Sequence, residues 1–393
     1  MSTFPRWQRW LWVGALVWAT AAQAQTPTLE PGPFRWPRPT AGSSTLTLVA
    51  VGDVLLHEPL HRQMLTSPEG AQSLWSEVTP WIHQADLAYA NLEGPMAPGT
   101  LAGGRPFPDP GSIFDRRVYT SYPAFNYHAR LAQDLKRSGF DVVSTANNHA
   151  LDRGARGADL TLDVLDQAGL AHMGTRRQAE TSGVSGAGWV TVSSKAGWRV
   201  AWMACSFSTN GIPDRYHQVL NCFSDRARVL DLVRRWAHTP GIDAVVVTPH
   251  VGVEYETRPR PEVVRLDEDL IDAGALVVLG AHPHVLQPWT QYRAKDGRMG
   301  LIVYSLGNFV SGQFQREATR SSALIWVQLT RSSAGQVTIA QTQFLPLRME
   351  RQGAHLQVVP LNPVEETPAE RHRFNVMFQQ RQAMGVFQNL PGS

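Results

Sequence analysis

The chain has 393 residues, of which 43% are hydrophobic and 18% are charged, and its formal net charge is +3. This length allows one large domain with extensions, or two domains. Two of the positive charges belong to Arg6 and Arg9, and the remaining charge, near +1, gives no basic patch of the kind that nucleic-acid binding requires. We therefore expect no nucleic-acid partner.

The first segment of the chain indicates export. Its two arginines precede an apolar run at residues 11–22, and Ala22-Gln23-Ala24 is an A-x-A cleavage sequence. The apolar run is shorter than the roughly 20 residues that span a bilayer. We expect residues 1–24 to be a cleaved signal peptide and residues 25–44 to be a Pro-rich linker. The mature protein would then be periplasmic or extracellular, without a stable membrane span. The alternative is that residues 1–24 are kept as an anchor.

Strand-like and helix-like stretches alternate through the first three quarters of the chain. Runs of small and β-branched residues predict strands at 45–51, 87–90, 140–145, 199–204, 244–248 and 275–279. Apolar residues three or four apart predict helices at 68–84, 126–137, 157–167, 224–237 and 261–273. Such alternation predicts crossover connections and a largely parallel sheet.

The pattern changes after Gly300. Strands separated by short breaks are predicted at 301–305, 323–329, 337–344 and 355–359, followed by a polar helix at 365–382. Alternating polarity in residues 336–344 is typical of an antiparallel sheet with one exposed face. The pattern by itself predicts an α/β fold with an antiparallel addition.

Two stretches do not match core elements. Residues 95–123 are rich in Gly, Pro and Asp, and residues 206–221 lie between the two cysteines of the chain. Long loops at strand ends are commonly functional covers; for the first stretch a disordered insertion is the alternative. In an oxidising compartment Cys205 and Cys222 are expected to form a disulfide, the alternative being two buried free thiols.

Polar residues recur where the predicted strands end. Five such ends carry a carboxylate, an amide or an imidazole: Asp53, Glu93, Asn147-Asn148-His149, His250 and His282-Pro283-His284. Open α/β sheets place their chemistry at these ends. The set has the composition of a two-metal hydrolytic site.

These residues form motifs that resemble a known family. In order, the motifs are Gly52-Asp53, Asn91-Leu92-Glu93, Asn147-Asn148-His149 with Asp152 and Gly154, His250 with Glu254, Gly280-Ala281-His282-Pro283-His284, and Ser305-Leu306-Gly307-Asn308-Phe309. They are similar to the motifs of the CapA proteins, which are associated with poly-γ-glutamate capsule synthesis and belong to the calcineurin-like metallophosphoesterase superfamily. The resemblance implies a four-layer αββα sandwich with a catalytic domain at residues 45–310. Residues 311–393 would add C-terminal antiparallel strands that complete the sandwich, and a terminal helix.

The resemblance also implies a centre for divalent metal ions, two in number. It assigns Asp53 and His284 to the first ion, Glu93 to a bridging position, and the remaining ligands to the second ion: Asn148, His250 and His282. Imidazoles mixed with oxygen ligands suit Mn²⁺, Fe²⁺ or Zn²⁺ without separating them. One position departs from the superfamily, because Leu55 stands where many members have a histidine. His57 either compensates as a ligand or has a supporting or surface role.

The neighbours of the ligands have expected roles as well. His149 directly follows Asn148, so it should project beside the metals as a general acid. Asp152 either orients His149 or caps the following helix. Glu254 is expected to fix the ring of His250, and residues 305–309 to form a structural turn. Three arginines of the long loop are either solvated or in contact with a polyanion: Arg105, Arg116 and Arg117.

Two functions follow from these features. The first is an exported metal-dependent hydrolase acting on an anionic envelope or capsule substrate, either a phosphoester or a γ-glutamyl polymer. The second is a non-enzymatic polymer-binding or assembly and export factor, working in a capsule-synthesis complex with a vestigial metal site. Leu55 favours the second function, whereas the intact Asn148-His149 and His282-Pro283-His284 favour the first.

Overall fold

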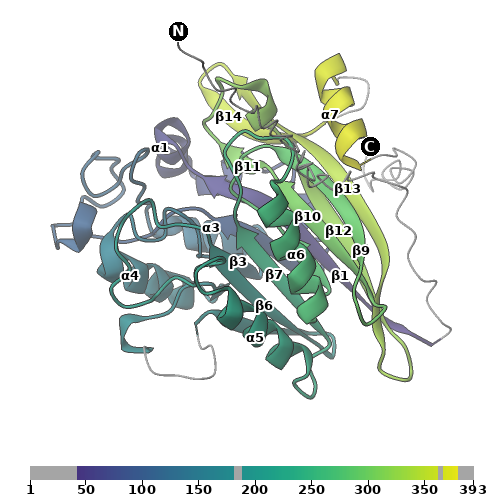
Figure 1. Cartoon of the computed structure of the whole chain (residues 1–393). Helices are drawn as coiled ribbons and strands as arrows, with labels where there is room; N and C mark the ends of the chain where they lie inside the picture. The colour runs from purple at the N-terminus through teal and green to yellow at the C-terminus, as the bar shows by residue number, and fades with distance from the viewer. Residues whose placement is uncertain (1–41, 181–187, 362–365, 379–393) are drawn as a thin grey trace, which may run out of the picture.

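Two β-sheets pack face to face at the centre of the fold (Figure 1). The computed structural model describes residues 42–180, 188–361 and 366–378, so the expected signal peptide lies outside the described residues. One sheet has eight strands in the order β14-β13-β12-β1-β2-β3-β4, with β11 paired to β1. The other has six strands in the order β5-β6-β7-β8-β10-β9.

The bounds of the elements are as follows. The eight-stranded sheet contains β1 (Ser44–Leu55), β2 (Leu87–Leu92), β3 (Val142–Ser144), β4 (Ala171–Met173), β11 (Asn308–Ser311), β12 (Ser321–Arg331), β13 (Val337–Gln352) and β14 (His355–Pro360). The six-stranded sheet contains β5 (Val190–Lys195), β6 (Trp198–Ser206), β7 (Ala244–His250), β8 (Val277–Leu279), β9 (Leu286–Arg293) and β10 (Met299–Leu306). The α-helices are α1 (Glu58–Thr66), α2 (Thr79–Ile82), α3 (Arg130–Arg137), α4 (Gly154–Gln167), α5 (Arg226–Ala237), α6 (Pro261–Ala273) and α7 (Pro368–Phe378). Short 3₁₀ turns are η1 (Gly70–Leu74), η2 (Ala102–Gly104), η3 (Gln178–Glu180) and η4 (Glu317–Arg320).

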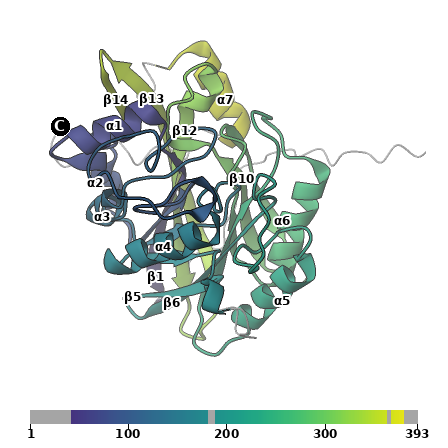
Figure 2. The ribbon, with the colours of Figure 1, turned by 90° about the vertical axis from the view of Figure 1, so that its left-hand side faces the viewer.

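Alternation along the strands sorts side chains into layers. In β1, Leu46 and Leu48 point into the core between the sheets, whereas Val49 and Val51 point outward to the helices. This is the two-residue period of a strand buried on both faces. Helices α1, α2 and α3 cover the outer face of the eight-stranded sheet, and α5 and α6 cover that of the six-stranded sheet (Figure 2). The predicted αββα sandwich is confirmed.

Strand direction brings the site together. Strands β1 to β4 are parallel in one sheet, and β6, β7, β8 and β10 are parallel in the other, whereas β12 runs antiparallel to β1. The carboxyl ends of β1, β2, β3, β7 and β8 carry the predicted ligands, which meet between the sheets. Among the described residues, no helix is long and apolar enough to cross a membrane.

Two predicted helices differ from the structure. Residues 68–84 form η1 and α2 in place of one helix, because the backbone leaves the helical region at Trp75, with φ −150° and ψ 27°, and α2 begins only at Thr79. The start of η1 is held by the Ala71 N–H, which donates to the Asp134 carboxylate. Helix α3 begins four residues later than expected, since Asn126 pairs with Thr120 and its side chain bonds to Ala97 and Val118. The apolar stripe predicted for residues 68–84 is nevertheless buried.

Candidate metal centre

Two glycines allow the strand ends of both sheets to approach each other. A Cβ atom at Gly52 would lie 1.8 Å from the Gly307 carbonyl oxygen, and one at Gly280 would lie 2.1 Å from the Tyr304 carbonyl oxygen. Only a residue without a side chain fits such contacts. Asp53 therefore follows one close backbone crossing, and the His282-Pro283-His284 turn follows the other.

The Glu93 carboxylate lies at the middle of the cluster and is fully buried. Its Oε1 is 3.5 Å from His250 Nε2 and 3.8 Å from His284 Nε2. Within the described part of the chain, neither carboxylate oxygen has a hydrogen-bond partner. Burial favours the neutral acid, but the charges of His284 and His250 outweigh it and hold the pKa of Glu93 below its usual range. A buried carboxylate without hydrogen bonds is costly, and a bound cation offsets that cost.

The first group of ligands forms around His284. Its Nδ1 lies 3.1 Å from Asp53 Oδ2 and 3.0 Å from Asn308 Oδ1. Because both neighbours are acceptors, Nδ1 carries a proton, and Nε2 lies on the side of Glu93. Burial disfavours the imidazolium, yet Glu93 and Asp53 raise the pKa of His284 to about 9. The metal-free ring is therefore protonated at neutral pH, and a bound cation would take the place of the Nε2 proton. The side chain of Asn308, expected to be only part of a turn, thus orients a ligand.

The second group consists of Asn148, His250 and His282. His250 Nε2 is 2.8 Å from Asn148 Oδ1, and His282 Nδ1 is buried without a partner among the described residues. Burial lowers the pKa of His282 well below its usual value, with His250 and His284 adding to the effect, so its ring is neutral as a ligand must be. His282 and His284 have positive φ angles of 98° and 60°, a strained backbone that aims the two rings at different places.

The donor set fits divalent cations. Ligand atoms of Asp53, Glu93 and His284 lie within 4.8 Å of one another, and so do those of Glu93, His250 and His282. Glu93 belongs to both groups, which is the position of a bridging carboxylate. The structure therefore brings together all six sequence-predicted ligands. Five belong to these two groups, and the sixth, Asn148, contacts His250 through its Oδ1.

His149 and Asp152 form a pair beside the ligands. Their Nδ1 and Oδ2 atoms are 2.7 Å apart, and the same Oδ2 accepts the Phe125 backbone N–H at 2.6 Å. Helix α4 begins at Gly154 without a side-chain cap, so Asp152 holds His149 and does not cap the helix. Although burial disfavours the charged ring, Asp152 raises the pKa of His149. His149 faces a cavity of about 260 Å³, the catalytic cavity, which is also lined by His57, Tyr122, Phe125 and His284.

His57 lies outside both groups of ligand atoms. Its Nδ1 lies 3.2 Å from the Gly312 backbone nitrogen, whose N–H can only donate, and 3.3 Å from Leu55 O, which also accepts the His57 backbone N–H. Burial lowers the pKa of His57 to about 4, so the ring is neutral. With the Gly312 N–H bound at Nδ1, the ring would carry its proton on Nε2 and offer an N–H donor to the catalytic cavity.

Glu254 does not fix the ring of His250. It is exposed, and its carboxylate lies near the nitrogens of His282 and His284. The partner of His250 Nδ1 is the side-chain amide of Asn91, at 3.2 Å, which also donates to Asp53 at 2.7 Å. The sequence contains a sign of this role, because Asn91 and Glu93 are two residues apart and so share one face of the strand.

Both predicted covers reach the site. The loop 206–221 places the Phe207 ring 4.5 Å from the His282 ring, and Asn210 accepts a bond from Asn148. The disulfide Cys205–Cys222 closes this loop, as predicted. The structure describes residues 95–123 throughout, with a small core of Phe114, Val118 and Tyr119, which argues against a disordered insertion.

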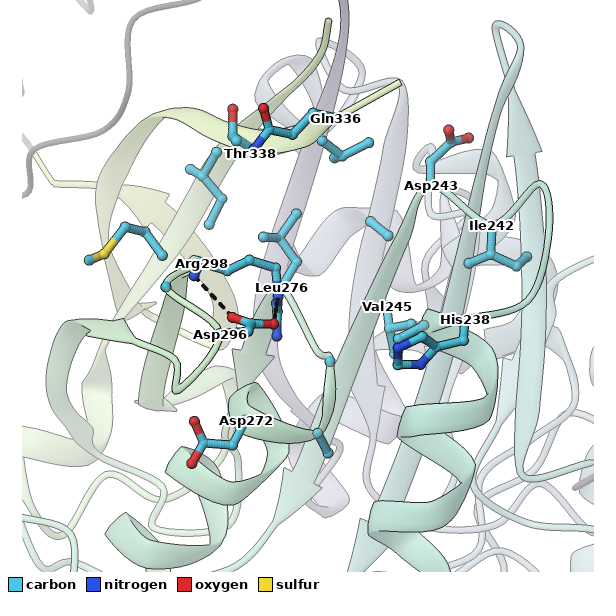
Figure 3. A pocket seen from close by; sticks show the side chains of 18 of the residues that line it. His238, Ile242, Asp243, Val245, Asp272, Leu276, Asp296, Arg298, Gln336 and Thr338 are labelled. Carbon is cyan, nitrogen blue, oxygen red and sulfur yellow. Dashed lines mark hydrogen bonds and ion pairs between the residues drawn. The ribbon is translucent and has the colours of Figure 1, made fainter. Parts of the chain in front are cut away.

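A second cavity of about 560 Å³ lies at the opposite end of the fold, where β7, β8 and β10 begin (Figure 3). Its charged side chains neutralise one another or their neighbours. Asp296 pairs with Arg298, Asp272 with Lys295, and Asp243 with Arg331. The predicted ligands are not among the residues that line it, so this cavity is separate from the metal centre.

The αββα sandwich, with this cluster between its two sheets, defines a protein of the calcineurin-like metallophosphoesterase superfamily. A family model described as "Bacterial capsule synthesis protein PGA_cap" matches residues 47–313. The chain belongs to this family, and the resemblance to CapA proteins is confirmed.

Named relatives agree with the family. The chain is 28% identical over 336 residues to "Capsule biosynthesis protein CapA" of Bacillus anthracis, covering 82% of this chain and 69% of the relative. It is 26% identical over 338 residues to "PGA biosynthesis protein CapA" of Bacillus subtilis, covering 83% and 76%.

Solved structures give weaker likenesses. The NAD nucleotidase of Haemophilus influenzae is 9% identical with a TM-score of 0.46, covering 86% of this chain and 56% of that one. A putative 5'-nucleotidase from Staphylococcus aureus is 14% identical with a TM-score of 0.45, covering 86% and 58%. With TM-scores below 0.5, neither likeness indicates a function for this chain.

Proposed function

We propose that this protein is an exported, divalent-metal-dependent hydrolase that acts on an anionic capsule or envelope polymer. The single observation that carries the proposal is the buried Glu93 carboxylate, which has no hydrogen-bond partner in the described chain and lies between two groups of ligand atoms. Asp53, Glu93, Asn148, His250, His282 and His284 would hold two ions. When bound, such ions supply Lewis-acid polarisation of the scissile group and activation of water.

The residues beside the ligands supply the acid function. His149 is held by Asp152 through Nδ1, so its Nε2 faces the catalytic cavity and can pass a proton to a leaving oxygen or nitrogen. His57 Nε2–H can hydrogen-bond an anionic oxygen of the substrate. The aromatic side chains of Tyr122 and Phe125 line the same cavity, and the buried Phe125 ring excludes water from part of it.

The capsule assignment comes from the family and from the relatives, one of which is named for PGA biosynthesis. Among the bonds of an anionic polymer, a γ-glutamyl amide and a phosphoester would both gain from metal polarisation and a general acid. Export is supported by the N-terminal sequence and by the disulfide, which suits an oxidising compartment. A capsule-synthesis complex is a natural setting for such an enzyme.

The proposal is tested by loading the purified mature protein with Mn²⁺, Fe²⁺ or Zn²⁺ and measuring hydrolysis. The panel consists of p-nitrophenyl phosphate, bis-p-nitrophenyl phosphate and poly-γ-glutamate. We expect turnover of at least one compound, lost in Glu93→Gln and retained in His172→Ala, which alters a histidine outside the centre. Leu55 leaves the first metal group one imidazole short, so metal-loaded protein without turnover would favour the non-enzymatic assembly factor.

A further inference from the structure

A further cavity, on the side of the metal centre, adjoins the catalytic cavity and is rich in arginine. Its volume is about 390 Å³, and Arg116, Arg117 and Arg153 line it. We call it the arginine cavity. Tyr122 lines both cavities, and its side chain is 74% exposed. The two cavities are thus neighbours on one face of the loop 95–123.

Arg153 is a buried cation without a carboxylate partner. Only 1% of the residue is exposed, and its guanidinium donates to the backbone oxygens of Asp152 and Val118 and to the Thr120 hydroxyl. Its Nε is buried and has no partner, and no described carboxylate forms an ion pair with it. Burial lowers the pKa of Arg153 to about 10, so it is charged at neutral pH. A buried cation without an ion pair is costly. The charges of Asp152 and Asp115 offset part of that cost, and an anion in the cavity would offset more of it.

The other two arginines differ in how their charge is compensated. Arg116 makes a two-pronged contact with the Glu58 carboxylate, with nitrogen to oxygen distances of 2.7 to 3.1 Å. Glu58 also accepts a bond from Arg62, so its negative charge is already shared. Arg117 stacks over the Phe107 ring at 4.4 Å and has no ion pair within the described chain. Arg117 and Arg153 therefore leave positive charge at the cavity.

We infer that the arginine cavity is a subsite for a carboxylate of a repeating anionic chain, one unit away from the bond that lies in the catalytic cavity. The guanidinium fork matches the planar carboxylate. The inference rests on the proposed function, and it assigns the binding of a neighbouring acid group of the polymer, such as γ-linked glutamate, to residues outside the metal centre. Tyr122, at the boundary of the two cavities, would contact the chain between the subsites.

The experiment is calorimetric binding of γ-linked glutamate oligomers to the metal-free mature protein, at two salt concentrations. We expect Arg117→Gln to weaken binding roughly 5- to 10-fold and to reduce the salt dependence, since one charge-assisted hydrogen bond is lost. The matched control is Arg105→Gln, an exposed arginine of the same loop that does not line the cavity. This control should bind as the wild type does. Arg117→Lys should recover only part of the affinity, because an ammonium keeps the charge without the fork.

Two results would overturn the subsite. The first is equal affinity of wild type and Arg117→Gln for the oligomers, whether or not the protein hydrolyses anything. The second is Arg117-dependent binding of inorganic polyphosphate without binding of γ-glutamyl oligomers, which would make the cavity a phosphate site. Because binding is measured without metal, a protein that binds oligomers through Arg117 but shows no turnover would refute only the hydrolase.

Discussion

Replacing His149 by Ala separates metal binding from proton transfer. The substitution removes the 2.7 Å contact to Asp152 and leaves that buried carboxylate with the Phe125 N–H as its neighbour. Loss of a hydrogen bond to a charged group costs about 1.5 to 3 kcal/mol of unfolding free energy. Turnover should fall by roughly 10² to 10⁴, the usual contribution of a positioned general acid. Metal content should stay near that of the wild type, since the ligands of both groups remain.

The assays are urea unfolding, metal analysis and steady-state hydrolysis on the same preparations. Asp152→Asn keeps an acceptor for Phe125 N–H but removes the charge beside His149. The double variant should therefore lose little more turnover than His149→Ala alone, because the two residues act as a unit. The matched control is His172→Ala, whose ring lies 3.0 Å from Asp166 away from the metal centre, with 15% of its side chain exposed. It should retain turnover. Full activity of metal-loaded His149→Ala would refute the general-acid role.

Three further outcomes are expected. His57→Gln should retain more turnover than His57→Asn, because the Gln amide N–H can replace Nε2–H. Metal content should be unchanged in both variants, and a drop in metal content would instead make His57 a ligand. The double variant Cys205→Ser and Cys222→Ser should lower the unfolding free energy by about 3 kcal/mol in the chain-entropy model. It should also reduce turnover, because the loop that carries Phe207 and Asn210 is released. An unchanged urea midpoint would contradict this. Burial, with a smaller effect of Glu268, raises the pKa of Asp267 well above its usual value. Above pH ~4, the unfolded-state pKa, the unfolded chain releases this proton while the folded chain keeps it, so Asp267 lowers the stability, and the loss grows as pH rises toward the folded pKa. Asp267→Asn should therefore raise the melting temperature more at pH 8 than at pH 5, and an equal shift at both would count against the assignment.

The ligands could be predicted from sequence because a local pattern marks them. Strand-forming runs precede Asp53, Glu93 and His250, and parallel strands bring their carboxyl ends to one edge. The four-layer sandwich was implied by the family resemblance, since the pattern alone predicted only an α/β fold with an antiparallel addition. Helix α6 has the bounds that its apolar spacing and its proline at the first position predicted. Residues 68–84 illustrate the limit, since their apolar stripe is buried while a non-helical backbone at Trp75 separates η1 from α2.

The supporting residues could not be predicted in this way. Phe125 belongs to an irregular loop, and its contact with Asp152 depends on how that loop folds over α4. The contact of His57 Nδ1 comes from Gly312, 255 residues further along the chain. Asn308 was expected in a turn, but it begins β11, which pairs with β1, and this pairing brings its side chain to His284. Such contacts are tertiary and leave no periodic pattern in the sequence.

The metal centre itself is tested most directly by the metal content of the purified mature protein and of Glu93→Gln, determined by mass spectrometry after loading and gel filtration. Two divalent ions per chain are predicted for the wild type, and less than one for Glu93→Gln, because the bridging charge is shared by both groups of ligands. Melting temperature should rise with metal in the wild type and respond far less in the variant. A wild-type protein that keeps no divalent metal, or a Glu93→Gln variant that keeps both ions, would contradict the account.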